Sequence, residues 1–425
     1  VVHTGRIVLK LADDEGFGVD AVGALTAAVP ERAARVAAAI DQVLGPTDIA
    51  RIFTRREIDL AFDRLCGERW TGEQMPDLSQ FLLLNPRDGW SAAIVETLAD
   101  SLNTLDFVEL AYLEPRVYPG GMPAGSNKTT LDFESLQGYL DPAPIGVDAV
   151  SAWGLPGGAG QSVKLIDVEL GWNVHFTAPD GKFNHGHEDL PWPFVAIGNF
   201  NAGVPQATKH GTAVLGIVAG QRNGFGITGI ADGSPVGVAA AELQAAPTAN
   251  AVDLAASVLS PYEVVLLEYQ IAGPPGLAPG SSCPGEIDPV DTALVPAEFD
   301  YAIFSAVRTA TANLRIVVAA AGNYAVDLEH PLLEGRFDPY SPAFIDSGAI
   351  LVGSRQSSSG APMCATNFGK RVDASAWGEN VVTAGYGDLD PGEPPVYENQ
   401  YTSLFGGTSS AAAIVAGASL SIQSM

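Results

Sequence analysis

Four short apolar runs in the second part of the chain constrain its fold most strongly. Stretches with helical spacing separate these runs, which lie at residues 163–166, 264–267, 316–319 and 350–352. Runs this short and this apolar are typical of strands in a parallel sheet that is covered by helices on both faces. We therefore expect an α/β domain with a buried parallel sheet, whose functional residues gather at the carboxyl ends of the strands.

The first 118 residues show a different order of elements. Apolar runs typical of strands alternate with stretches of helical spacing, in the order strand 7–11, helix 31–44, strand 81–84, helix 91–102 and strand 106–112. This order predicts a small α+β domain over residues 1–118. Residues 119–136 are rich in Pro, Gly and Ser and are expected to be a linker to the larger domain, 137–425.

Composition narrows the class of partner. The 425 residues carry 49 acidic and 22 basic side chains, a net charge of −27, which argues against nucleic acid because a polyanion would be repelled. No apolar stretch of about 18 residues is present, so we expect no membrane-spanning helix. Cys283 and Cys364 can pair if the protein is exported, which would leave Cys66 free.

Two polar residues precede stretches of small residues with helical spacing. Ser409 lies in Gly406-Gly407-Thr408-Ser409, before an Ala-rich stretch, and a hydroxyl at a helix N-terminus is well placed for nucleophilic attack. Such a nucleophile needs a base, and His210, followed by Gly211 and Thr212, is the candidate. Taken singly, each has an ordinary alternative: an N-cap serine and a core or surface histidine.

Two further polar residues follow buried runs. Asp167 ends the run 163–166, where a carboxylate can hold the imidazole of a catalytic histidine, although an aspartate there can also cap a turn. Asn323 follows Gly322 after the run 316–319, and its amide can donate to an oxyanion or simply occupy a turn.

Together these segments resemble the subtilisin-like serine protease family. The order Asp, His, Asn, Ser is the family's order, and the matching motifs are His-Gly-Thr at 210–212, Ala-Ala-Gly-Asn at 320–323 and Gly-Thr-Ser at 407–409. The resemblance covers residues 137–425 and implies a serine endopeptidase with catalytic Asp167, His210 and Ser409, and Asn323 as oxyanion donor.

The chain departs from the family pattern in three places. The family's catalytic Asp is usually followed by Ser or Thr and then Gly, whereas Val168 and Glu169 follow Asp167. Thr212 is followed by Ala rather than His, and Ala413 stands where the family commonly has Pro. The family's chains usually continue further beyond the serine helix, so the resemblance implies a catalytic domain that is short at its C-terminal end.

The resemblance also implies a substrate groove. One wall is assigned to Glu268, Tyr269 and Gln270, and the other to residues 320–322, which are Ala320, Ala321 and Gly322. Substrate backbone would pair there as an added strand. Glu268 would favour a basic substrate side chain if it faces the primary pocket; the alternative is that it points into solvent.

No cofactor is required for this chemistry, but the resemblance implies a structural calcium ion. The implied ligands are Gln137, Asp189 and Asn223, oxygen donors of the type that Ca²⁺ prefers. His185 and His187 form a second candidate metal pair, but no third ligand accompanies them, so loop histidines are the simpler interpretation.

Residues 1–118 resemble the inhibitory propeptide of the same family. The resemblance implies a secreted proenzyme, with a signal peptide outside this chain, whose partners are a peptide or protein substrate and its own N-terminal domain. The segment 113–118 would occupy the groove. Two alternatives stay open: an inactive peptide-binding relative, and a nucleotide-binding α/β protein, against which the absence of a Gly-x-Gly-x-x-Gly motif at a strand end argues.

Overall fold

The computed structural model describes most of the chain. The described residues are 3–13, 16–19, 25–27, 30–45, 47–86, 92–115, 117–118, 130–177, 183–184, 186–198, 205–241, 245–280, 283, 293–391 and 399–425. Most of the predicted linker 119–136, and His185, therefore lie outside the described residues.

The larger part of the molecule is built on a seven-stranded sheet whose pairings are all parallel. Its strands, in spatial order, are β11 (Ala196–Ile197), β12 (Val236–Ala240), β8 (Leu165–Glu169), β13 (Val264–Leu267), β16 (Ile316–Ala320), β17 (Ile350–Arg355) and β18 (Ala374–Trp377). The predicted parallel sheet is confirmed. The extent of β8 matters most: the strand continues through Asp167 to Glu169, because it pairs along that length with β12 and, up to Val168, with β13.

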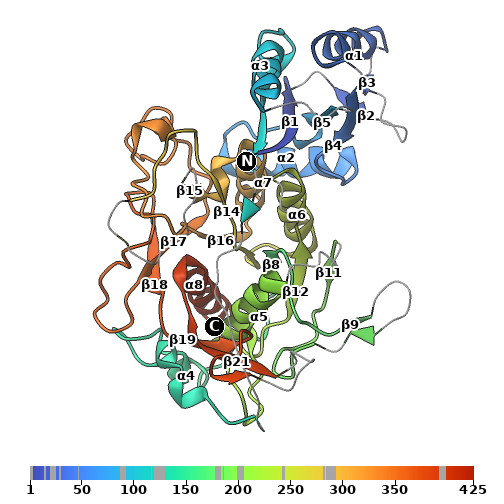
Figure 1. Cartoon of the computed structure of the whole chain (residues 1–425). Helices are drawn as coiled ribbons and strands as arrows, with labels where there is room; N and C mark the ends of the chain where they lie inside the picture. The colour runs from blue at the N-terminus through green and yellow to red at the C-terminus, as the bar shows by residue number, and fades with distance from the viewer. Residues whose placement is uncertain are drawn as a thin grey trace.

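Helices cover both faces of this sheet (Figure 1). On one face, α6 (Ala245–Val258) and α7 (Tyr301–Ala312) bury Ile166 and Val168 of β8. On the other, α5 (Pro205–Ala219) and α8 (Gly407–Ser424) share a core with Leu165. Successive side chains of a strand point to opposite faces, so Asp167 and Glu169 point to the α5 and α8 face.

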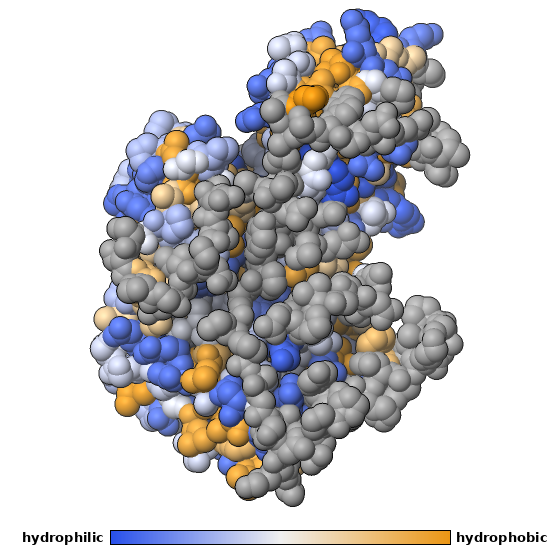
Figure 2. Space-filling view, viewed as in Figure 1, coloured by the Kyte–Doolittle hydropathy of each residue, from blue (hydrophilic) through white to orange (hydrophobic). Residues whose placement is uncertain are grey.

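The N-terminal part is the predicted small α+β unit. Its antiparallel sheet has the order β4 (Thr47–Arg51), β5 (Phe81–Pro86), β1 (His3–Leu11) and β6 (Val108–Pro115). The helices of this unit are α1 (Pro30–Leu44), α2 (Glu57–Thr71) and α3 (Ala92–Leu102). Figure 2 shows this unit projecting from the rest of the molecule, with apolar and hydrophilic residues side by side on its visible face.

The N-terminal unit is fixed to the larger part by packing and by charge. Phe53 and Leu60 are buried in the same apolar core as α6 and α7. Arg55 donates from Nε and Nη2 to the carboxylate of Asp253 on α6, at 2.8 and 2.7 Å. A guanidinium that binds both oxygens of a buried carboxylate fixes orientation as well as position.

A small antiparallel sheet joins the two parts a second time. Its middle strand is β14 (Gln270–Ala272), flanked by β15 (Leu294–Pro296) and by β7 (Val117–Tyr118). β7 follows β6 of the N-terminal unit, and it pairs Tyr118 with Gln270 and Val117 with Ile271.

The remaining elements are short and lie around these two parts. They are β2 (Phe17–Val19), β3 (Leu25–Ala27), β9 (Phe176–Thr177), β10 (Phe183–Asn184), β19 (Val381–Ala384), β20 (Asp390–Pro391), β21 (Gln400–Phe405), α4 (Ala149–Ala152), η1 (Leu78–Gln80), η2 (Glu134–Leu136), η3 (Gly138–Leu140), η4 (Ala297–Phe299) and η5 (Pro331–Leu333).

The cysteines behave as the sequence allowed. Cys283 and Cys364 form a disulfide, and Cys66 is free. Among the helices that the structure describes, none combines the length and the hydropathy needed to cross a membrane.

Candidate active site

Ser409 lies in the first turn of α8, two residues after the helix begins at Gly407. Its side chain is buried, with 4% of its surface exposed. Gly407 has a φ of 79° and a Cβ at that position would lie 3.1 Å from Oδ1 of Asn323, so the turn requires glycine. The first N–H groups of a helix lack intrahelical acceptors, which leaves the Ser409 N–H available to an oxyanion.

Asn323 lies directly beside this turn, as predicted. Its Oδ1 accepts a hydrogen bond from the backbone N–H of Thr408 at 2.8 Å, and its own backbone N–H donates to Oε1 of Gln270 at 3.0 Å. Because the amide oxygen is engaged, the NH₂ group is the part of the side chain that can donate to a substrate oxygen.

His210 lies within α5 and is buried, with 1% of its surface exposed. Its Nδ1 makes a hydrogen bond with Oε1 of Glu169, while its Nε2 makes none within the described part of the chain. Gly211 allows α5 to lie close to the segment that follows β8, because a Cβ at position 211 would lie 2.4 Å from the carbonyl oxygen of Gly171. The imidazole is thus held by one nitrogen, and the other remains available to take a proton.

The carboxylate that contacts His210 is Glu169, and the prediction of Asp167 in this role is wrong. Oδ2 of Asp167 instead accepts a hydrogen bond from Nε1 of Trp172 at 2.7 Å. The physical reason is the length of β8: the strand ends at Glu169, so Asp167 lies one strand repeat too early to reach the ring.

A signal for Glu169 was present in the sequence. In the family, the catalytic Asp and the following Gly are separated by one residue. Glu169-Leu170-Gly171 has the same spacing, with Glu in place of Asp. A Cβ at position 171 would lie 3.3 Å from Oγ1 of Thr208 on α5, so a glycine here leaves room for that helix.

Three buried carboxyl groups share one face of two neighbouring strands. Asp167 and Glu169 lie on β8, and Glu268 directly follows β13, with its N–H donating to the carbonyl of Val168 at 3.5 Å. Their exposed fractions are 0%, 1% and 3%, respectively. Carboxyl groups that lie this close together and this far from solvent cannot all be ionised.

The pKa values show how the charge is shared. Burial and, secondly, the charge of Glu169 raise the pKa of Asp167 well above its usual range, against the hydrogen bond from Trp172. Burial raises the pKa of Glu268 in the same direction, as do Glu169 and Asp167, while the neighbouring Ser409 hydroxyl lowers it. The charged forms of Asp167 and Glu268 are therefore both disfavoured beside Glu169, the carboxyl group that His210 contacts.

The hydroxyl of Ser409 lies against the carboxyl of Glu268. This contact is close enough to affect the pKa of Glu268, yet neither carboxyl oxygen makes a well-formed hydrogen bond. Glu268 is buried, so the alternative that it points into solvent is wrong.

Of the other predicted groove residues, Gln270 lies in β14, and Oε1 of its side chain accepts a hydrogen bond from the backbone N–H of Asn323. Tyr269 is buried, and within the described part of the chain its hydroxyl makes no hydrogen bond. Ala320 ends β16, whereas the backbone of Ala321 and Gly322 is bound by Asn367.

The three predicted calcium ligands do not form a cation site as arranged. Both oxygens of Asp189 accept hydrogen bonds, from Nδ2 of Asn223 at 2.8 Å and from the N–H of Ile227 at 2.6 Å. The amide of Gln137 is bound to the backbone of Thr228. Because donors surround the carboxylate, a cation has no place there without rearrangement.

His187 behaves as a core histidine. It is buried, its Nε2 contacts the carbonyl of Gln400 at 2.8 Å, and burial lowers its pKa to about 4. No cluster of three or more His, Cys, Asp or Glu side chains suited to a metal ion occurs in the described ranges.

Comparison with known proteins identifies the family of the larger part of the chain. The family model described as "Subtilase family" matches residues 197–425. No curated protein sequence matches the chain.

Solved structures of proteases resemble the fold at low sequence identity. Fervidolysin from Fervidobacterium pennivorans, a keratinolytic enzyme related to subtilisin, is 13% identical with a TM-score of 0.54. The match covers 98% of this chain, which spans only 54% of the fervidolysin chain. A cold-adapted subtilisin-like serine proteinase is 21% identical over 61% of this chain and 74% of its own, with a TM-score of 0.39. With its family model matched over more than half of its length, this chain belongs to the subtilase family.

Proposed function

We propose that the chain is a serine endopeptidase that hydrolyses peptide bonds through Ser409, His210 and Glu169. The observation that carries the proposal is the state of His210: Nδ1 is held by a buried carboxylate while Nε2 is unpaired. This is the arrangement that a general base needs in order to accept a proton from a serine hydroxyl.

The proposed reaction is acyl transfer in two halves. The Ser409 hydroxyl attacks the substrate carbonyl and its proton passes to Nε2 of His210, while the oxyanion is bound by the Asn323 amide and the Ser409 N–H. His210 then gives the proton to the leaving amine, and water releases the acyl group by the same steps in reverse. Glu169 keeps the imidazole in the correct tautomer and stabilises its charged form.

We also propose that residues 1–118 inhibit the enzyme until they are removed. The support is the pairing of β7 with β14, since β14 begins at Gln270, whose amide binds the backbone of Asn323. A chain segment paired to that edge would compete with substrate for it. Domain boundaries at 118 and 136 remain part of this proposal.

We also propose that the protein is exported and that it binds a structural calcium ion. The disulfide Cys283–Cys364 supports an extracytoplasmic location, because such bonds persist in oxidising compartments. Calcium binding by Gln137, Asp189 and Asn223 would require their hydrogen bonds to be rearranged, and no step of the proposed reaction uses it.

Neighbouring serines offer a matched test. We expect Ser409→Ala to abolish hydrolysis of a fluorogenic peptide, whereas Ser410→Ala keeps it, because Ser410 binds the carbonyl of Trp377 and lies outside the proposed chemistry. Hydrolysis that survives in Ser409→Ala would contradict the proposal. A folded wild-type chain that binds peptides but never cuts them would favour the inactive peptide-binding alternative.

A further inference from the structure

Glu268 is a buried acidic side chain beside the nucleophile, and the reaction proposed above gives it no role. Only 3% of its surface is exposed. Neither Oε1 nor Oε2 makes a hydrogen bond of good geometry with any residue that the structure describes. Because a buried carboxyl group without partners destabilises a fold, its presence at a proposed active site points to a function there.

The register of the parallel sheet fixes where Glu268 lies. β13 pairs with β8 so that Leu267 is opposite Val168, and the N–H of Glu268 continues this ladder to the carbonyl of Val168. The next pair in the same register is Glu268 and Glu169. Side chains at paired positions of neighbouring strands point to the same face, with their backbones about 5 Å apart. Two carboxyl groups that share such a buried position are difficult to ionise together.

Among the described residues, the charged groups that act on Glu268 are acidic. Burial raises its pKa most, and Glu169 and Asp167 of β8 raise it further. The neighbouring Tyr269 stays neutral, because burial and then the same two acids raise its pKa well above the ordinary value. From α5, His210 contacts Glu169. The proposed reaction requires Glu169 in its charged form to stabilise the imidazolium, so the proton of this carboxyl pair belongs on Glu268.

The protonation state of Glu268 affects the Ser409 hydroxyl directly. This hydroxyl lies against the Glu268 carboxyl group and stabilises its charged form, since it lowers the pKa of Glu268. Nε2 of His210, meanwhile, makes no hydrogen bond within the described part of the chain. A charged acceptor forms stronger hydrogen bonds than a neutral one. An ionised Glu268 would therefore compete with Nε2 for the proton of Ser409 more strongly than a neutral Glu268.

The order of the strands adds a second effect. β13 lies between β8 and β16, so Glu268 lies between Glu169, at the end of β8, and Asn323, three residues after β16. Asn323 is the proposed donor to the oxyanion. A negative charge on Glu268 would lie close to that oxyanion and oppose its formation, whereas a neutral carboxyl group would not.

We propose that Glu268 is a further catalytic residue of the peptidase reaction, which must be protonated for Ser409 to react and which stops hydrolysis when it ionises. It touches the reacting hydroxyl but transfers no proton: the proton of Ser409 passes to Nε2 of His210, and Glu268 keeps its own. This inference rests on the proposed peptidase function.

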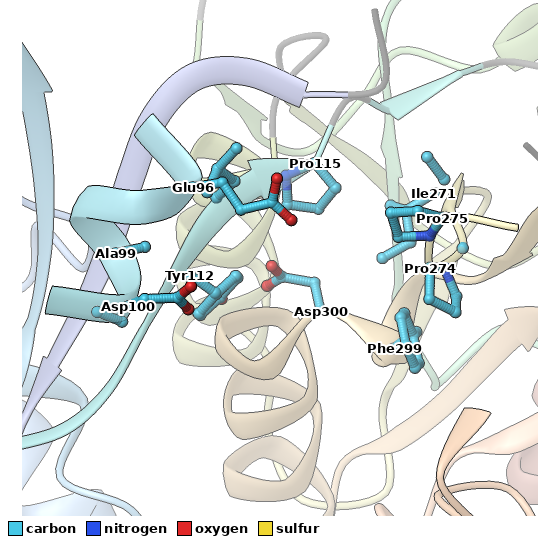
Figure 3. Close-up of a pocket in the computed structure, with 14 residues that line it drawn as sticks. Glu96, Ala99, Asp100, Tyr112, Pro115, Ile271, Pro274, Pro275, Phe299 and Asp300 are labelled. Carbon is cyan, nitrogen blue, oxygen red and sulfur yellow. The ribbon is translucent and has the colours of Figure 1, made fainter. Parts of the chain in front are cut away.

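The N-terminal unit lies close to Glu268 and has to be considered in the test. Tyr112 and Pro115 of β6 line a cavity of ≈ 490 Å³ together with Ile271 of β14 (Figure 3). β7, which follows β6, pairs with β14 from Gln270, two residues after Glu268. Hydrolysis is therefore measured on the full chain before and after limited proteolysis, so that cover by β7 is not mistaken for an effect of Glu268.

The test is the pH dependence of kcat/KM for a fluorogenic peptide from about pH 5 to about pH 10, corrected for unfolded protein by circular dichroism at each pH. On the alkaline side, kcat/KM of the wild type should fall by about tenfold per pH unit, as one ionisation requires. Glu268→Gln keeps the shape and the neutral state, so it should lack this fall and stay within about tenfold of the wild-type maximum. Glu268→Asp keeps an ionisable group and should keep the fall.

Glu334→Gln, which removes an exposed carboxyl group elsewhere, should keep the wild-type profile. Three results would overturn the role of Glu268 alone. They are wild-type and Glu268→Gln profiles that coincide up to about pH 10, a folded Glu268→Gln that is inactive at every pH, and a Glu268→Asp profile that lacks the alkaline fall. Absence of hydrolysis in every variant, with Ser409 unreactive toward a fluorophosphonate, would overturn the proposed peptidase function as well.

Discussion

Two buried sites in the larger part of the molecule differ in the number of hydrogen-bond donors around their carboxyl groups. Asp189 is surrounded by donors: the Ile227 N–H, the Asn223 amide and the Tyr401 hydroxyl, at 2.6, 2.8 and 3.3 Å. Asp167, Glu169 and Glu268 instead lie beside one another, and among the described residues neither carboxyl oxygen of Glu268 makes a hydrogen bond of good geometry.

We interpret Asp189 as part of a structural site, and the cluster of Asp167, Glu169 and Glu268 as part of a site of chemistry. Satisfied buried polar groups stabilise a fold and fix its local arrangement. Buried polar groups that lack hydrogen-bond partners and lie close to like charges destabilise the fold. Such groups are concentrated at the functional sites of proteins. The contrast predicts that substitution of Asp189 changes stability, whereas substitution of Glu169, which contacts His210, changes activity.

The largest effect is expected at Glu169. Glu169→Gln keeps the shape but removes the charge that holds His210 and stabilises its protonated form, so kcat should fall by about 10⁴. Peptide hydrolysis by folded variants measures this, with circular dichroism to verify folding.

Asp167→Asn is the matched control for Glu169→Gln. Asp167 lies two residues away on the same strand face but contacts Trp172, so its substitution should lower kcat by less than about tenfold. Equal losses in the two variants, or a larger loss in Asp167→Asn, would restore Asp167 as the orienting carboxylate.

A smaller effect, on stability rather than on chemistry, is expected at Asp189. Asp189→Ala leaves the Ile227 N–H and the Asn223 amide without their acceptor, which should lower the free energy of unfolding by about 2–4 kcal/mol. Chemical denaturation measures the loss. kcat per folded molecule should stay within about threefold, and a selective loss of kcat would break the contrast between the clusters.

The effect expected at Glu268 depends on pH. Burial raises the pKa of Glu268 well above its ordinary value of 4.5, so the folded chain holds this proton where the unfolded chain has lost it. The stabilising contribution is full below pH 4.5 and is lost as the pH rises toward the raised pKa, with a slope of up to about 1.4 kcal/mol per pH unit.

Glu268→Gln removes this titration. Relative to wild type, the variant should gain stability as the pH rises above 4.5, as measured by unfolding at each pH. Glu334→Gln, at an exposed position, should show no such gain. A constant difference between Glu268→Gln and wild type across this range would show that Glu268 is not held neutral by its surroundings.

The sequence predicted the parallel sheet because short apolar runs that alternate with helical stretches are typical of its buried strands. The runs at 264–267, 316–319 and 350–352 all became strands of the parallel sheet. Ser409, His210 and Asn323 could be singled out as candidates, because each sits in a motif of small residues where the backbone must approach closely.

The carboxylate partner of His210 was missed for a physical reason. Asp167 interrupts the apolar run, so the run seems to end there, but hydrogen bonding to β12 carries β8 on to Glu169. Strand length is set by neighbouring strands that are distant in sequence, and periodicity alone does not reveal it.

The calcium prediction shows a second limit. Gln137, Asp189 and Asn223 were placed by resemblance, and Asp189 and Asn223 do meet in space. The Phe225 N–H, however, binds Oδ1 of Asn223 and so turns the NH₂ group toward Asp189. The proximity of Asp189 and Asn223 could be predicted by resemblance, whereas the orientation of the Asn223 amide depends on a backbone contact that the sequence does not display.

The most direct test of the proposed chemistry is covalent labelling with a fluorophosphonate, mapped by mass spectrometry. The full chain is labelled before and after limited proteolysis, so that cover by the N-terminal unit cannot hide the site. We predict a single adduct on Ser409, absent in Ser409→Ala and strongly reduced in His210→Ala. A folded chain that stays unlabelled in both states, or that carries the adduct on another residue, would contradict the assignment of Ser409 as an activated nucleophile.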